Sequence, residues 1–568
     1  MKRAGPLAAF TLLVFAFMMY VAFPLAMMAG ESLKAGGVFS FHQYASLFDP
    51  ANGANSEAIL NSIFVAVLSV VFSGLLGLCL AFVVTQVEFP GKAVVARLAI
   101  LPIALPPLVG VIAFRFVFGS SGLLPRILQG ILHTANPVLA LEGIPGVVIV
   151  HVYSFHVYTY LFCAAALRNI DGALIDAAAG LGSRGWRTFR KVILPELRPA
   201  LLASAALTCM SSMASFTAPL LFAGEKRFLT LQIFQTKLNG DVNLAAAQSV
   251  LLTFVSLGLY AVMMSVGGTP QTARGGKGVA RRGVLPVPPI LRRLLVGGTF
   301  LLLLAELLPV AMIVLLSFVR EGSWTTQLLP DRYATQNYLS LLGERKMLEP
   351  LLNSLLCAGI AVIGSILFGV SAAVLASRAQ GRFWGKAANI ILTLPYAVPG
   401  TVVAIALIVS FNIPRWWTGG MGLVGTFWIL PFAYIMREYP VVVRSVTASL
   451  ETMDGSLLDA ADGLGASAWK RFRSVLLPAI APAILSGAVL VAIASLGEFV
   501  SSIMLYTYAS RPVSVEILAQ LRQFNIGAAS AYAVCLMLLI LLILWIPSFL
   551  GRGGSGRENV TAMMDSSF

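Results

Sequence analysis

Charged residues are scarce in this chain, and their scarcity excludes most soluble folds. Only 11% of its 568 residues are Asp, Glu, Lys or Arg, whereas soluble domains carry about 25%. Hydrophobic residues make up 58%, which is more than a soluble core of this length could bury. Apolar stretches of roughly 18 or more residues recur along the chain, without the alternation of barrel strands. The composition therefore predicts an all-α polytopic membrane protein.

Residues that bind metals are few and scattered. His151 and His156 lie in one apolar stretch, but their spacing does not place them on one helical face and no third ligand is near. No CxxC pair occurs, and all five cysteines lie in apolar stretches: Cys79, Cys163, Cys209, Cys357 and Cys535. We expect inert buried thiols and no metal site in this chain.

A phosphate-binding loop is also missing, because no G-x-x-x-x-G-K-[ST] motif occurs. Three Gly-Lys pairs exist, each followed by Ala or Gly: Gly91-Lys92, Gly276-Lys277 and Gly385-Lys386. If ATP drives this protein, hydrolysis must come from another chain. No convergent catalytic set stands out in the apolar stretches either, which disfavours a membrane-embedded enzyme.

Positive charge exceeds negative charge, and the net charge is +15. In membrane proteins Lys and Arg concentrate in cytoplasmic loops, and with a cytoplasmic N-terminus most of them fall on that side. No basic patch is interleaved with aromatic residues, so nucleic acid is not an expected partner. We expect membrane lipids as partners and both termini in the cytoplasm.

The apolar stretches predict about 12 transmembrane helices, six in each half of the chain. Four regions follow: a first lobe at 1–267, a cytoplasmic linker at 268–290, a second lobe at 291–550 and a cytoplasmic tail at 551–568. The run 7–29 is too long for a signal peptide and is predicted to be a retained first span. An even number of spans in each half makes the two six-helix repeats parallel.

Short landmarks repeat at matching places in the two halves. Asn61-Ser62 opens the second span, and Asn353-Ser354 opens the eighth. Leu101-Pro102 and Leu394-Pro395 begin Pro-rich segments that are predicted to break or kink the third and ninth helices. Kinked helices at matching positions point to a transport pathway, although Pro is also common in membrane helices in general. Both interpretations stay open.

The strongest internal repeat is a basic segment. Residues 176–199 read DAAAGLGSRGWRTFRKVILPELRP, and residues 459–482 read DAADGLGASAWKRFRSVLLPAIAP. We predict that these residues contact a partner: Asp176, Ala177, Ala178, Gly180, Gly182, Trp186 and Pro195 in the first copy, and Asp459, Ala460, Ala461, Gly463, Gly465, Trp469 and Pro478 in the second.

Each copy has the properties of a protein-docking surface. Ala supplies helix propensity with little bulk, and Gly180 and Gly182 allow a sharp turn between two short helices. Trp186 is an anchor inside a rim of Arg and Lys, and Pro195 is predicted to end the second helix. The alternative is a basic amphipathic loop lying on anionic lipid, which does not explain two copies that keep Asp, Gly, Trp and Pro in register.

These segments resemble the EAA loop of ABC importer permeases, whose pattern is E-A-A, three residues, G, nine residues and I-x-L-P. Here DAAAGLG…VILP and DAADGLG…VLLP carry Asp in place of the opening Glu, which keeps the carboxylate. Nearly the whole chain is similar to the fused permeases of iron(III), thiamine and 2-aminoethylphosphonate importers. The resemblance implies a type I importer fold with coupling loops at about 168–199 and 451–482.

The resemblance also implies a location and partners. The chain would lie in a bacterial inner membrane, with two copies of a cytoplasmic ABC ATPase that bind ATP and Mg²⁺. A periplasmic or extracellular substrate-binding protein would deliver the cargo, which is expected to be ferric iron, with 2-aminoethylphosphonate or thiamine as alternatives. The outer loops 224–244 and 509–527 match each other and would receive that protein, or would only cap the helix bundle.

One ionisable residue interrupts the eleventh span. Glu498 is predicted to lie mid-span beside Phe499, and Ser215 with Phe216 occupies the same place in the first half. Ionisable groups inside membranes are costly, so these four residues are the pathway candidates. A Glu that is bonded to a neighbouring helix for packing fits the sequence equally well. Glu306, predicted near the start of the seventh span, is a weaker candidate.

An ion-coupled secondary transporter is the rival class, because such proteins can also have two parallel six-helix halves. That class needs coupling carboxylates in mid-membrane and no docking loops for an ATPase. Glu498 alone is weak evidence for a secondary transporter, whereas the paired basic segments favour an ATP-driven importer.

Overall fold

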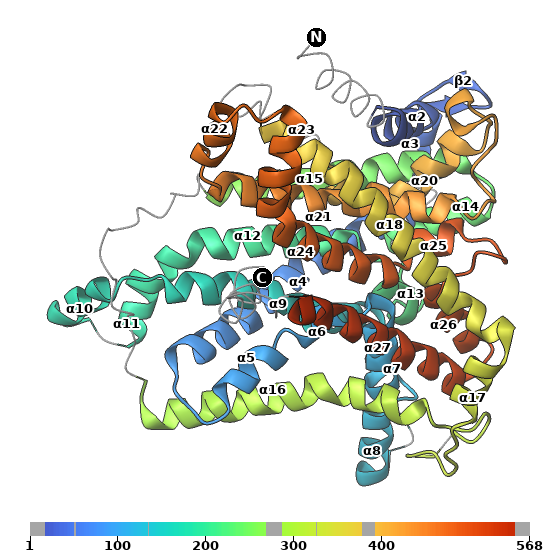
Figure 1. The fold of residues 1–568 in the computed structure, drawn as a ribbon. Coiled ribbons are helices and arrows are strands. Elements are labelled where there is room, and N and C mark those ends of the chain that lie inside the picture. The colour runs from blue at the N-terminus through green and yellow to red at the C-terminus, as the bar shows by residue number, and fades with distance from the viewer. Residues whose placement is uncertain are drawn as a thin grey trace. The chain divides into compact units, whose positions relative to one another are not determined.

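The computed structural model describes residues 18–49, 53–134, 136–183, 185–267, 287–324, 327–377, 392 and 394–550. These residues are mostly helical (Figure 1). The sheet within them is a hairpin in which β1 (Lys34–Ala35) pairs antiparallel with β2 (Val38–Phe39). Nine helical segments of the described residues are long and apolar enough to cross a membrane. The prediction of an all-α polytopic membrane protein is confirmed.

The helices of the first half of the sequence are, in chain order, η1 (Met18–Ala22), α2 (Phe23–Glu31), α3 (His42–Leu47), α4 (Gly53–Gln86), α5 (Lys92–Leu98), α6 (Leu101–Ala104), α7 (Pro107–Phe118), α8 (Leu123–Leu132), α9 (Gly143–Arg168), α10 (Gly172–Gly180), α11 (Trp186–Thr188), η3 (Phe189–Ile193), α12 (Leu194–Met213), α13 (Thr217–Phe222), α14 (Leu229–Leu238) and α15 (Val242–Gly267).

Those of the second half are α16 (Pro289–Leu316), α17 (Gln336–Gly343), α18 (Arg345–Ser377), η4 (Leu394–Ala397), α20 (Gly400–Phe411), η5 (Trp416–Thr418), α21 (Ile429–Thr452), α22 (Ser456–Gly463), α23 (Ala468–Arg471), η6 (Phe472–Leu476), α24 (Leu477–Leu496), α25 (Val500–Leu505), α26 (Val513–Arg522) and α27 (Ile526–Leu550). The predicted linker 268–290 lies outside the described residues except for its last four positions, and the predicted tail 551–568 lies wholly outside them.

The chain forms two compact units. The N-half unit comprises Tyr44–Gln235 and Leu251–Tyr333, and the C-half unit comprises Met1–Gln43, Thr236–Val250 and Ala334–Phe568. Each unit is built mainly from one half of the sequence but includes the first helix of the other half. Thus α16 packs against α7, α4 and α5 in the N-half unit, and α2 packs against α20 in the C-half unit. The lobe boundaries that the duplication suggests stay a prediction.

Close backbone approach holds α4 against α9 in the N-half unit. A Cβ added at Gly77 would clash with the carbonyl oxygen of His156 and would lie 2.7 Å from the Cβ of Thr159. In the C-half unit α18 packs on α21 in the same way, since a Cβ at Gly369 would lie 2.8 Å from the Cβ of Val442. Small residues at such contacts are the usual means by which membrane helices pack.

This contact gives a stability prediction with a control in the same helix. Gly77→Ala should force α4 and α9 apart and lower the free energy of unfolding by about 1–3 kcal/mol, as overpacked cores do. Gly74→Ala is the control, because a Cβ there would meet nothing within 4 Å. Thermal unfolding of the purified protein in detergent measures both. Equal midpoints for the two variants would mean that the close contact at Gly77 does not limit stability.

The Pro-rich segments break the third and ninth spans, as predicted. The third span is divided into α5, α6 and α7, with extended backbone at Leu105 and Pro106. In the ninth, η4 is followed by the extended Pro399, after which α20 begins at Gly400. Proline restricts the residue before it to extended geometry, which explains the extended Leu105 and Pro106 ahead of Pro106 and Pro107.

Candidate coupling segments and pathway residues

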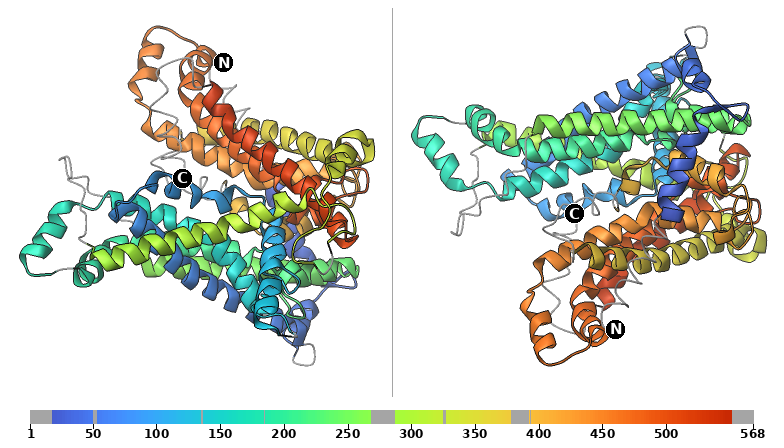
Figure 2. Two further views of the ribbon diagram at one scale, coloured as in Figure 1. Left: turned by 90° about the horizontal axis from the view of Figure 1, so that it is seen from below. Right: turned by 90° about the horizontal axis from the view of Figure 1, so that it is seen from above.

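The two repeated segments fold in the same way; we call residues 171–195 and 454–478 the first and second coupling segments. Figure 2 shows α10 and α11 of the first segment as a hairpin beyond the ends of α9 and α12. Asp171 caps α10, since its Oδ1 accepts a hydrogen bond from the backbone N–H of Ala173 at 2.9 Å. Asp454 accepts the equivalent bond from Ser456 at 2.9 Å, which lowers the pKa of the Asp454 carboxyl.

The turn after each short helix is closed by the same three backbone hydrogen bonds. In the first segment Leu181, Gly182 and Ser183 donate to the carbonyls of Ala177, Ala179 and Ala178, at 2.9–3.1 Å. The second segment has the equivalent bonds from Leu464, Gly465 and Ala466. These are the bonds of a helix C-cap that needs one residue with positive φ.

Only one glycine of each predicted pair serves this turn. Gly182 has φ +77° and Gly465 has φ +76°, a backbone geometry that disfavours other residues. Gly180 and Gly463 end their helices without positive φ, and a Cβ at either would meet nothing within 4 Å. The prediction that Gly180 shapes the turn was therefore wrong, and the described fold gives no reason for a glycine there.

Proline does not end the second short helix, contrary to the prediction. The chain stays helical from Trp186 through η3 into α12, and Pro195 lies in the first turn of α12. The N–H of Leu194 bonds to the carbonyl of Phe189, five residues earlier. Such a wider π-turn accommodates a ring that has no N–H and would otherwise clash with the carbonyl four residues back. Pro478 follows an identical turn, η6.

Each coupling segment exposes three large apolar side chains, which we call its apolar triad. Leu174, Leu181 and Trp186 are 46%, 89% and 72% exposed. The equivalent Leu457, Leu464 and Trp469 are 52%, 89% and 67% exposed. The sequence prediction included the tryptophans but missed the leucines, although their recurrence at the same offset in a basic loop was a usable signal. Large exposed apolar groups rimmed by charge are typical of protein interfaces.

The other predicted residues of the segments divide between an inner and an outer face. Ile175 and Ile193 pack into the core of the N-half unit, and Ala178 is buried beside them. Asp176 and Ala177 are exposed. In the second segment Asp459 and Ala460 are likewise exposed and Ala461 is half-buried.

Different side chains close the two hairpins. In the first segment the Thr188 hydroxyl donates to the Ser183 hydroxyl at 3.1 Å. In the second, Arg471 pairs with Asp462 at 2.5 Å. The two segments therefore expose equivalent apolar triads, but a hydroxyl pair in the first segment is replaced by an ion pair in the second.

The pathway candidates lie at helix breaks, not within a helix as was predicted for Glu498. The chain leaves helical hydrogen bonding between α24 and α25, at Gly497, Glu498 and Phe499. Ser215 and Phe216 occupy the equivalent break between α12 and α13. Hydropathy did not reveal these breaks, because the few Ser, Thr and Gly residues around them do not interrupt the long apolar stretch. Phe499 and Phe216 are both 1% exposed.

The carboxylate of Glu498 is fully engaged within the C-half unit. Its Oε2 lies 2.6 Å from Nη1 of Arg437 on α21, and its Oε1 accepts the N–H of Ser501 at 2.6 Å at the start of α25. Glu498 is 9% exposed, whereas the Arg437 side chain keeps 25% exposure. A Cβ added at Gly400 would lie 2.6 Å from Nη1, so α20 begins directly beside the guanidinium. Sequence reasoning missed Arg437, although an arginine within the tenth span was a usable signal.

A histidine surrounded by serine hydroxyls replaces this ion pair in the N-half unit. Nε2 of His151 lies 2.9 Å from the hydroxyl of Ser215, and its Nδ1 lies 2.9 Å from Ser69 and 3.0 Å from Ser212. The Ser215 carbonyl also accepts a bond from the hydroxyl of Thr230 at 2.8 Å. The lobes therefore differ at this position, with Ser215 bonded to a histidine and Glu498 bonded to an arginine.

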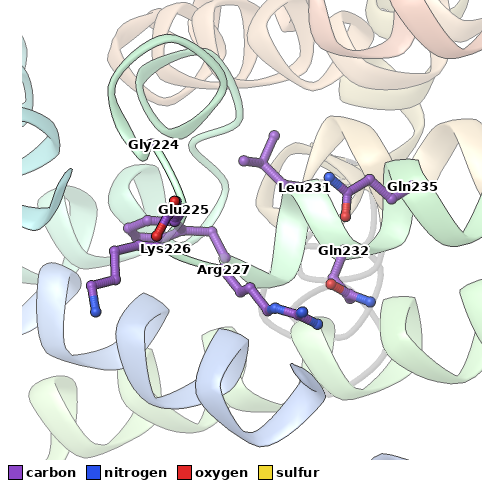
Figure 3. A pocket seen from close by; sticks show the side chains of 8 residues that line it. Gly224, Glu225, Lys226, Arg227, Leu231, Gln232 and Gln235 are labelled. Atoms are coloured by element: carbon purple, nitrogen blue, oxygen red, sulfur yellow. The ribbon is translucent and has the colours of Figure 1, made fainter. Parts of the chain in front are cut away.

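The outer loops are anchored by the Asn-Ser landmarks. Asn61 donates to the carbonyl of Arg227, and Ser62 accepts from Leu229. In the other half Asn353 donates to the carbonyl of Arg511, and Ser354 accepts from Val513. A pocket of about 280 Å³ lies over the first of these loops and the start of α14 (Figure 3). Its lining is mainly polar: Gly224, Glu225, Lys226, Arg227, Phe228, Leu231, Gln232 and Gln235.

Fold and site together define a class, namely a polytopic α-helical membrane protein built on a duplicated unit, each copy carrying one exposed loop of the same design. Residues 73–268 and 365–553 match the family described as binding-protein-dependent transport system inner membrane component, and the chain belongs to that family. It is an ABC importer permease subunit, a multi-pass protein of the inner membrane.

Named relatives agree with this family. "Probable ABC transporter permease protein y4fN" of Sinorhizobium fredii is 28% identical over 81% of this chain and 81% of its own length. "Ferric transport system permease protein FbpB" of Actinobacillus pleuropneumoniae is 27% identical over 95% of this chain and 78% of its own. A protein of Salmonella typhi named as a 2-aminoethylphosphonate transport system permease protein, PhnU, is 29% identical over 42% of this chain and 83% of its own.

Proposed function

We propose that this permease is driven by a separate ATPase that binds its two coupling segments. The observation that carries the proposal is the pair of equivalent apolar triads, Leu174–Leu181–Trp186 and Leu457–Leu464–Trp469, on two identically folded hairpins. Equivalent surfaces fit equivalent grooves, so the partner would be two copies of one cytoplasmic ABC ATPase. Those subunits would bind ATP and Mg²⁺, and this chain would hold no cofactor.

The predicted contact residues take specific roles in this proposal. Asp176 and Asp459 are exposed and placed to meet basic or amide groups of the ATPase. Gly180 and Gly463 face open space, so the absence of a side chain there lets the partner approach closely. Pro195 and Pro478 join each hairpin to α12 or α24 through a continuous helix, which suits transmission of a force from the ATPase to the membrane. Both segments and both termini would then be cytoplasmic.

The proposed cargo route passes the helix breaks at Ser215–Phe216 and Glu498–Phe499. An external binding protein would deliver the cargo to the outer loops, where the pocket beside Arg227 offers charged and amide groups to a docking protein. Ferric iron is the favoured cargo, because the ferric relative matches 95% of this chain whereas the 2-aminoethylphosphonate relative matches 42%. 2-Aminoethylphosphonate and thiamine are the alternatives.

Purification and uptake test the proposal. The tagged chain, extracted from its native host in mild detergent, should retain an ATPase at two copies per permease, and deletion of the gene should abolish uptake of radiolabelled ferric iron. Uptake of 2-aminoethylphosphonate and thiamine, measured in the same strain, is the control for cargo. Loss of one of those two instead would keep the importer and change the cargo. Uptake that survives ATP depletion and collapses with an uncoupler would instead identify an ion-coupled secondary transporter.

A further inference from the structure

The helix α16 opens the second half of the sequence but packs within the N-half unit. Its Leu303 is 5% exposed and shares an apolar core with Leu80 of α4 and Cys163 of α9. Nearer its start, Phe300 meets Phe89 edge-on, with 6.1 Å between ring centroids. These contacts are apolar, and at the exposed start of α16 Arg292 also donates a hydrogen bond to the carbonyl of Glu88. Apolar ridges pack in several registers and water can replace an exposed hydrogen bond, so these contacts on their own do not determine how far α16 slides along the unit.

One buried polar pair lies among them. Nε2 of His156 on α9 lies 3.1 Å from Oε1 of Glu306 on α16, and the two side chains are 0% and 3% exposed. Glu306 lies past the middle of α16, not near the start of the span as the sequence suggested. Neither carboxylate oxygen has a hydrogen-bond partner elsewhere in the described part of the chain, so His156 is the group that Glu306 depends on.

The chemistry of the pair makes the two residues dependent on each other. Nδ1 of His156 lies 3.0 Å from the carbonyl oxygens of Val152 and Tyr153, and carbonyls only accept, so Nδ1 carries its proton. Nε2 and Oε1 can therefore form a hydrogen bond only if a second proton lies between them. Either the imidazole or the carboxyl group can carry that proton. A slip of α16 by one turn, about 5.4 Å, would leave both groups buried without that contact.

We infer that His156 and Glu306 are a positioning pair that fixes the register of α16 on the N-half unit. Buried polar pairs that specify register at a cost in stability are well attested in helical assemblies. Among the described residues no group of three or more His, Cys, Asp or Glu side chains includes this pair. The inference does not depend on the cargo or on the identity of the motor.

Native cysteines allow a direct test in the full-length protein. Cys163 is 0% exposed in the core that Leu303 of α16 covers, and Cys357 is 0% exposed in the C-half unit. Purified protein is treated with a membrane-permeant maleimide, and the labelled cysteines are assigned by mass spectrometry. Glu306→Ala and His156→Ala should each label Cys163 on the order of tenfold faster than wild type, since a loosened helix opens locally. Cys357 should stay at its wild-type rate.

Further variants separate a positioning pair from general damage. The double variant His156→Ala/Glu306→Ala should label Cys163 no faster than either single variant, because the pair acts as a unit. Glu306→Gln should keep most of the protection, since its amide can donate to Nε2. His151→Ala removes another buried histidine of α9, whose partners all lie in the first half of the sequence, and should leave Cys163 protected.

Three results would overturn the inference. They are protection of Cys163 in both single variants, additive rates in the double variant, and a joint rise of Cys163 and Cys357 labelling, which would indicate unfolding of the whole protein.

Discussion

Replacing Leu181 and Leu464 together with Asp should abolish attachment of the ATPase. Each leucine stands 89% exposed on the turn of its coupling segment, so it is placed to enter a groove of the partner. Buried interface anchors are worth about 2–4 kcal/mol each, and an unpaired carboxylate in that groove adds a desolvation cost. The expected weakening is about a hundredfold or more per site. Co-purification of the ATPase and cargo-stimulated ATP hydrolysis measure it.

The fold itself should tolerate this change, because neither side chain is part of a buried core. Thermal unfolding of the isolated permease should therefore match the wild type. Leu342→Asp is the matched control, since Leu342 is 66% exposed on α17, in a segment that lies on the outer side if both termini are cytoplasmic, as we propose. Full ATPase attachment in the Leu181→Asp/Leu464→Asp variant, or an equal loss in Leu342→Asp, would remove the apolar triads from the proposal.

Bulk at the unexplained glycines is an independent probe of the same surface. A Cβ at Gly180 or Gly463 meets nothing within 4 Å in this chain, so Gly180→Leu or Gly463→Leu should obstruct only a partner that approaches closely. Charge reversal with Asp176→Lys should act in the same direction through electrostatics. Normal attachment of the ATPase in these variants would mean that the ATPase groove does not contact this face of the hairpin.

The sequence predicted the elements of the coupling segments because their information is local. A turn glycine and a tryptophan that are repeated in register are recognisable without knowledge of the fold. The role of Gly180 and the path of the chain through Pro195 were wrong for a different reason. Both depend on backbone geometry, positive φ in one case and a π-turn in the other, that residue type alone does not determine.

Long-range packing was beyond the sequence. Composition and periodicity show that α16 is a membrane helix, but not which helices it packs against. The pairing of His156 with Glu306 joins residues 150 positions apart, in different halves of the duplication. Helix breaks at Glu498 and Ser215 were missed because each lies inside a long stretch of high mean hydropathy, and a hydropathy pattern does not distinguish a broken span from a continuous one.

Glu498→Gln is expected to slow transport at least about tenfold while the protein stays folded, because it removes a charge at a helix break inside the membrane. The glutamine carbonyl can still accept the N–H of Ser501, so the start of α25 keeps its cap. Arg437 loses its counter-ion. Its guanidinium, which is 25% exposed and lies beside Gly400, is then no longer neutralised by Glu498. Uptake by reconstituted complexes, normalised to attached ATPase, measures the effect.

Glu498→Ala should behave differently, because it removes the cap as well as the charge. Loss of one partner of a buried pair costs about 3–5 kcal/mol, and the partial exposure of Arg437 reduces that to about 1–3 kcal/mol. Arg437→Ala/Glu498→Ala should recover part of the stability but not the transport, since neither charge is restored.

Glu88→Gln controls for loss of an ion pair alone, because Glu88 pairs with Lys92 at 2.6 Å in the N-half unit, outside the helix breaks, the outer loops and the coupling segments. Glu498→Gln should lose transport per folded complex, and Glu88→Gln should keep it. Wild-type transport rates in Glu498→Gln would show that the Arg437–Glu498 pair serves packing alone. Removal of a charge that acts on the cargo, or on opening of the pathway, must change the rate.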